Sequence, residues 1–136
     1  MARSAKQRAR ATAWSHFSKY IRVRDALLTY GSATHCFCVT CGALKEIKKI
    51  HAAHFISREH EATMFDERNV HGCCYVCNVM KQGRWPEYFE FMEKTYGIET
   101  IRSLMEQRLI KIDLTEEDFR LIADKYRMLY KEICNG

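Results

Sequence analysis

The chain has 136 residues, of which 47% are hydrophobic and 29% charged, which indicates one globular domain over residues 1–136 and excludes a wholly disordered protein. No apolar run reaches the roughly 20 residues of a membrane span, and no hydrophobic segment follows the basic N-terminus, so we expect an intracellular protein without a membrane partner. The net charge is +5, but residues 1–86 hold 14 basic against 6 acidic side chains, whereas residues 87–136 hold 8 against 11. This asymmetry favours a polyanionic partner for the first part.

The N-terminal region is basic and contains one predicted helix. Residues 1–10 carry four basic and no acidic side chains, which predicts a flexible arm that contacts phosphates. Over residues 11–30, apolar side chains that include Trp14 and Phe17 recur at helical spacing with basic residues between them, which predicts a basic amphipathic helix. We expect both aromatic side chains to lie in the core rather than to stack on bases.

The cysteines predict a zinc-bound core over residues 34–84. Their number, seven, is odd, and four of them form two Cys-x-x-Cys pairs, which favours a metal site over a disulfide scaffold. Four thiolates suit tetrahedral zinc, and a closed set leaves no position for substrate, so we expect a structural ion. A strand at 46–56, a polar loop at 57–69 and a short helix after the second pair complete this core. The predicted ligands are Cys38, Cys41, Cys74 and Cys77. Cys36 or Cys73 is the alternative ligand in place of a neighbouring cysteine of this set.

Residues 86–136 predict a helical tail. Pro86 suits the first turn of a helix that ends near Gly97, and a second helix with apolar residues on one side follows it. The run Thr115 to Asp118 resembles a capping box that opens a third helix. This acidic segment holds no catalytic constellation, so it is expected to pack on the domain or to form a dimer.

A second cluster lies between the cysteine pairs. Ala53-His54-Phe55-Ile56, Asn69 and Asn78 resemble the strand, loop and helix positions of the HNH (ββα-metal) endonucleases. The resemblance implies that His54 is the general base, that Asn69 orients it, and that Asn78 ligates a catalytic Mg²⁺ or Mn²⁺. In that family the residue before the histidine is usually a metal ligand, and here it is Ala53. The candidate replacements are His51, which shares the strand face of residue 53, together with His71 and Gln82.

Longer stretches resemble the phage NinG/Rap recombination proteins. The segments that carry this resemblance are 14–26, 38–42, 53–58, 65–71 and 74–83. It implies an endonuclease for D-loops and Holliday junctions that acts as a homodimer, in the host bacterial cytoplasm if the gene is phage-borne. The implied fold class is α+β, with a zinc-stapled, treble-clef-like ββα-metal core between the basic helix and the helical tail. The DNA-binding candidates are Arg22, Arg24, Arg58, Lys81 and Arg84.

Two other functions fit the same residues. A general HNH nuclease that nicks duplex DNA would carry an identical motif, so only a comparison of substrates separates it from an enzyme for branched DNA. A non-catalytic zinc-finger module that binds DNA would explain why Ala53 offers no metal ligand. Replacement of His54 distinguishes the module from both nucleases, because a module should tolerate it.

Overall fold

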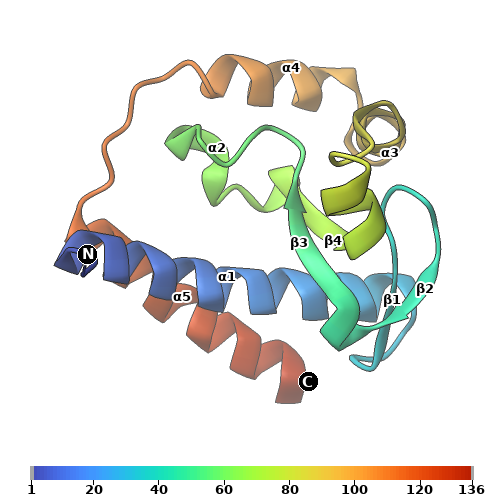
Figure 1. Cartoon of the computed structure of the whole chain (residues 1–136), viewed down its shortest axis with the longest axis horizontal. Helices are drawn as coiled ribbons and strands as arrows, with labels where there is room; N and C mark the ends of the chain where they lie inside the picture. Colours follow the sequence, from blue (N-terminus) through green and yellow to red (C-terminus); the bar gives the residue numbers. More distant parts are fainter. Residues whose placement is uncertain (1, 136) are drawn as a thin grey trace.

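A computed structural model describes residues 2–135 and shows the expected mixture of helices and small sheets (Figure 1). Within these residues, no helix is both long and apolar enough to cross a membrane. The two sheets have two strands each. The helices are α1 (Ala5–Thr29), α2 (Glu61–Met64), α3 (Trp85–Tyr96), α4 (Ile98–Gln107) and α5 (Glu116–Asn135), and the strands are β1 (His35–Phe37), β2 (Leu44–Glu46), β3 (Ile50–His54) and β4 (Val70–Cys74).

Helix α1 begins earlier than the charge pattern predicts. Ser4 accepts a hydrogen bond from the backbone N–H of Gln7, and the Gln7 side chain accepts one from the backbone N–H of Ser4. This capping box satisfies two backbone donors at the helix start, so most of the predicted flexible arm is helical. The helix ends at Thr29, and Gly31 adopts φ +93°, a conformation that favours glycine.

The strands β3 and β4 are antiparallel and place their side chains on two covered faces. Ile50 pairs with Cys74 and His54 with Val70. One face packs on α1, where Val70 joins the buried Phe17 and Ile21. The other face packs on α3 and α4. The sheet is fixed to α1 by Asp25, whose carboxylate accepts a 2.7 Å hydrogen bond from the backbone N–H of Gly72 in β4.

Two features bring the cysteine pairs and the loop to this sheet. Strands β1 and β2 form a hairpin, and the first Cys-x-x-Cys pair lies in the turn between them. The predicted polar loop over residues 57–69 contains α2 and the short 3₁₀ turn η2 (Glu67–Asn69), so it is more ordered than expected. A short π-helical segment, η3 (Val76–Met80), follows β4, holds Cys77 of the second pair and precedes α3.

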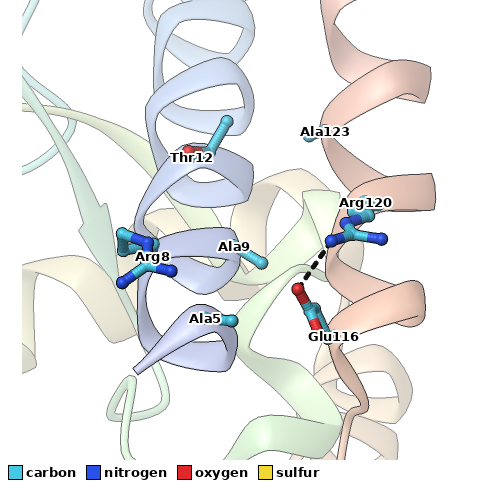
Figure 2. Close-up of a pocket in the computed structure, with 7 residues that line it drawn as sticks. All are labelled: Ala5, Arg8, Ala9, Thr12, Glu116, Arg120 and Ala123. Carbon is cyan, nitrogen blue, oxygen red and sulfur yellow. Dashed lines mark hydrogen bonds and ion pairs between the residues drawn. The ribbon is translucent and has the colours of Figure 1, made fainter. Parts of the chain in front are cut away.

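The helical tail has the three predicted helices. Thr115 and Asp118 exchange two hydrogen bonds at the start of α5, as the capping-box pattern predicts. Helix α5 runs alongside α1 in the same direction (Figure 1), and Phe119 is fully buried against Ala13. Figure 2 shows the start of this contact, where small alanine side chains from both helices face a groove and Arg120 pairs with Glu116. One face of α5 is therefore used for packing within the chain.

Candidate metal centre and DNA-binding site

Four cysteine sulfurs form a compact cluster between the β1–β2 turn and the β4–η3 junction. The Sγ atoms of Cys38, Cys41, Cys74 and Cys77 all lie within 4.8 Å of one another. Zinc–sulfur bonds of about 2.3 Å place tetrahedral ligands about 3.8 Å apart, so the cluster has the dimensions of a zinc site. The backbone N–H of Cys74 donates to Cys38 Sγ at 3.3 Å. Such donors stabilise a thiolate, and with the neighbouring Cys73 thiol they lower the pKa of Cys38.

The other cysteines lie outside this cluster. Cys73 Sγ is 3.8 Å from Cys38 Sγ but faces the opposite side of β4 from Cys74. Cys36 is buried against the backbone of Gly72, and burial raises the pKa of its thiol to about 11. Arg84, a predicted DNA contact, donates from Nε to Cys77 Sγ at 3.1 Å and therefore supports the cluster. Lys81 is exposed at the end of η3.

His54 is held at the end of β3 with one ring nitrogen bound. Its Nε2 lies 2.9 Å from the carbonyl oxygen of Met64, and its ring stacks on Trp14 with centroids 4.9 Å apart. Burial lowers the pKa of His54 to about 4, the Met64 carbonyl opposes this shift, and the positive charge of Arg58 adds to it. Because the carbonyl can only accept, Nε2 carries the proton and the Nδ1 lone pair of the neutral ring is free.

Asn69 is fully buried and does not contact His54 in the way the resemblance implies. Its Oδ1 accepts from the backbone N–H of Ile56, and its Nδ2 donates to the carbonyls of Ile56 and Thr63. These three bonds close the loop between β3 and β4. Since Thr63 precedes Met64, Asn69 acts on His54 indirectly, by fixing the loop that carries the Met64 carbonyl.

His51 and Asn78 meet on the other face of β3. Asn78 Nδ2 lies 3.3 Å from His51 Nδ1, so these two side chains form the candidate ion-binding pair. The strand register places His51 and Ala53 on the face opposite His54. Ala53 is only 2% exposed and supplies no ligand. Thus the structure brings Asn78 to His51 and places both on the opposite side of the strand from His54.

The structure corrects the prediction that His71 is a metal ligand, because neither of its ring nitrogens is available for a metal ion. Nδ1 lies 3.0 Å from the hydroxyl of Tyr88, and Nε2 lies 2.8 Å from that of Tyr96. Tyr88 in turn donates to the carbonyl of Ala53 at 2.7 Å. Burial lowers the pKa of His71 to about 3, so the ring is neutral at pH 7. His71 therefore fastens α3 to the sheet.

A basic cleft lies beside His54. Arg58 does not pair with Glu59 or Glu61 in the structure; its guanidinium stacks over Trp14, 5.4 Å from the ring centroid. Trp14 is only half-buried, unlike the fully buried Phe17, and its ring contacts both Arg58 and His54. The cleft has a volume of about 390 Å³ and is called the arginine cleft below; its lining residues are Arg3, Gln7, Arg10, Ala11, Trp14 and Arg58.

Arg24 of α1 differs from its predicted role. Arg24 donates to the Asp25 carboxylate and to the carbonyls of Glu67 and Val70, each at 2.8 Å, so it is an internal brace rather than a DNA contact. Arg22 donates to the carbonyl of Ser18 and is half-buried. The sequence pattern missed Arg10, which reaches Met64 at 3.4 Å from the arginine cleft; a helix that extends back to Ala5 would have placed it beside Trp14.

Replacing Arg24 with glutamine should lower the free energy of unfolding by about 3 kcal/mol, because it leaves the buried Asp25 carboxylate without its charge partner. Arg22→Gln, on the same helix, should cost less than about 1 kcal/mol. Urea unfolding of both variants measures the difference. If Arg24→Gln keeps wild-type stability and instead weakens DNA binding, the internal role is wrong.

Comparison with known proteins shows that the chain matches one protein family. A family model described as Bacteriophage Lambda NinG protein matches residues 3–135. Two curated relatives, each named Protein ninG, come from Escherichia phage 933W and Enterobacteria phage VT2-Sa. Each is 29% identical over 117 residues, which cover 86% of this chain and 54% of the relative, so the chain spans about half the length of these relatives. No solved structure matches the chain.

Proposed function

The chain belongs to the NinG family of bacteriophage lambda, and from this premise we propose that it is a metal-dependent endonuclease that hydrolyses phosphodiester bonds in branched DNA. The proposed substrates are D-loops and Holliday junctions. This choice rests on the resemblance to phage recombination proteins, since no residue spacing encodes a junction. The observation that carries the hydrolytic proposal is the state of His54 beside the arginine cleft.

His54 is prepared to act as a general base. A base must be unprotonated at the working pH, and a pKa of about 4 keeps the imidazole neutral at pH 7. The bond to the Met64 carbonyl fixes the ring and leaves Nδ1 free to accept a proton from water. The low pKa also makes His54 a weak base, so the reaction needs further stabilisation of the negative charge that develops on the phosphate.

The ion-binding pair is the candidate position for that stabilisation. A Mg²⁺ or Mn²⁺ ion held by His51 and Asn78 would stabilise negative charge on the phosphate and its leaving oxygen. In an in-line displacement the attacking and leaving oxygens lie on opposite sides of phosphorus. The base and the ion-binding pair lie on opposite faces of β3, so an ion held by the pair is suited to the leaving oxygen rather than to the attacking water.

The arginine cleft and α5 support the binding part of the proposal. Arg3, Arg10 and Arg58 line the arginine cleft, which suits a phosphodiester backbone next to His54. A junction has more than one strand to cut, which favours a homodimer. The outer face of α5 exposes Leu121 and Met128, each 60% exposed and seven residues apart, so they lie on one side of the helix and suit such an interface.

The substrate proposal is tested with four matched synthetic DNAs: a four-way junction, a D-loop, a flap and a linear duplex. With Mg²⁺ or Mn²⁺, the protein should cut the first two at least about tenfold faster than the duplex, a preference worth roughly 1.4 kcal/mol. Cleavage products are separated on denaturing gels. Equal cutting of all four DNAs would point to a general nuclease and overturn the junction preference.

A second candidate is a non-catalytic DNA-binding module. It is favoured by Ala53, which is buried under α3 and supplies no ligand, and by His71, whose nitrogens are both occupied. For such a module the wild-type protein would bind the four DNAs without cutting any of them.

A further inference from the structure

A second basic cleft lies at the start of β3. It has a volume of about 290 Å³ and is called the lysine cleft; its lining residues are Lys45, Lys49, His51, Cys74, Tyr75 and Val76. Lys45 belongs to β2, in the hairpin that carries the first cysteine pair, and Lys49 belongs to the short turn η1 (Ile47–Lys49) that directly follows this hairpin. The zinc cluster therefore positions these lysines against the β4–η3 junction.

The charge in this cleft is not neutralised within the chain. Three lysines lie between residues 45 and 49. Lys48 pairs with Glu46 at 3.4 Å, whereas within residues 2–135 no carboxylate pairs with Lys45 or Lys49. Tyr75 is 53% exposed and meets His51 edge-on, with ring centroids 5.8 Å apart. Lysines beside an exposed aromatic ring suit a nucleic acid, because phosphates bind the ammonium groups while a base or sugar packs on the ring.

The lysine cleft and the arginine cleft do not lie on one flat surface of the protein. His51 lines the lysine cleft on one face of β3, whereas His54 lies on the other face and stacks on Trp14 of the arginine cleft. The two histidines are three residues apart, about 10 Å along the strand. Two segments of DNA that leave a branch in different directions would suit this arrangement better than one straight duplex.

We propose that the lysine cleft binds the phosphate backbone of a second DNA arm while the arginine cleft holds the arm next to His54. This proposal rests on the proposed function, because it assumes branched DNA as substrate. It assigns Lys45, Lys49 and Tyr75 to DNA binding, and it gives a structural reason for a preference for junctions. The charge pattern of the sequence places these residues in the basic part of the chain but does not separate the two clefts.

The test is DNA binding by the zinc-loaded Lys45→Gln/Lys49→Gln variant without any other divalent ion, so that no cleavage occurs. For a four-way junction, the slope of log K against log salt should become shallower by about 2, one unit for each lost phosphate contact. Affinity should fall on the order of tenfold or more at 0.1 M salt. For a linear duplex of the same length, affinity should stay within about twofold, because the duplex occupies the arginine cleft alone.

The matched control is Lys111→Gln/Lys131→Gln, which removes the same charge from two exposed residues near and on α5. It should change neither slope. If both DNAs lose affinity equally with the lysine-cleft variant, or if neither does, the second-arm proposal is overturned. A wild-type protein that binds junction and duplex equally would instead overturn the proposed substrate itself, so the two failures are distinguishable.

Discussion

Replacing His54 with alanine should abolish DNA cleavage and leave DNA binding within a few-fold of wild type. The side chain is the candidate base, and loss of a positioned general base slows a reaction by roughly 10²–10⁴. The arginine and lysine clefts keep every charge, so affinity for a junction should persist. Single-turnover cleavage with Mg²⁺ or Mn²⁺ and equilibrium binding without them measure the two effects separately.

Two further variants separate chemistry from folding in this prediction. His54→Ala removes the bond to the Met64 carbonyl and leaves a cavity beside Trp14, at a cost of about 2–3 kcal/mol in stability. His54→Asn can still donate to that carbonyl but cannot accept a proton as imidazole does, so it should be more stable and equally inactive. His35→Ala, on β1 and away from both clefts, should cut normally. Full activity in His54→Asn would exclude His54 as the base.

The four-cysteine cluster was predictable from sequence because its information is local. A Cys-x-x-Cys turn directs its two sulfurs towards one point in any fold. Two such turns therefore form a four-sulfur site once the fold brings them together. The sequence could not choose between Cys73 and Cys74, since adjacent residues of a strand face opposite sides and the choice depends on the register with β3. The helices of the tail were also predictable, because caps and apolar periodicity are local signals.

The roles of single polar residues were much less predictable. Arg24 and Arg58 look alike in sequence, yet one is enclosed by Asp25 and two backbone carbonyls and the other stacks on Trp14 at the surface. The sequence likewise does not distinguish His71 from His51. In the structure, His71 lies beneath α3 and bonds to two tyrosines, whereas His51 meets Asn78. Such differences depend on which helix covers which face of the sheet, and that packing joins segments far apart in the chain.

Removing the zinc ion should unfold the protein. Cys38 and Cys41 from the β1–β2 hairpin meet Cys74 of β4 and Cys77 of η3, and without a metal ion these four close sulfurs have no common partner. Incubation with a strong chelator and a reductant should therefore remove the cooperative thermal transition seen by circular dichroism. The same treatment should release one zinc ion per chain, measured by elemental analysis.

The cysteine variants give this prediction its control. Cys77→Ser should lower zinc content and melting temperature together, whereas Cys134→Ser, an exposed residue outside the cluster, should change neither. Structural zinc binds with about 10–16 kcal/mol at neutral pH, while domains of this size have a total stability of about 5–15 kcal/mol. Loss of the ion thus exceeds or matches the whole stability, and the Met64 carbonyl would then no longer be held against His54. A metal-free protein that melts at the wild-type temperature would show that the four sulfurs meet for another reason.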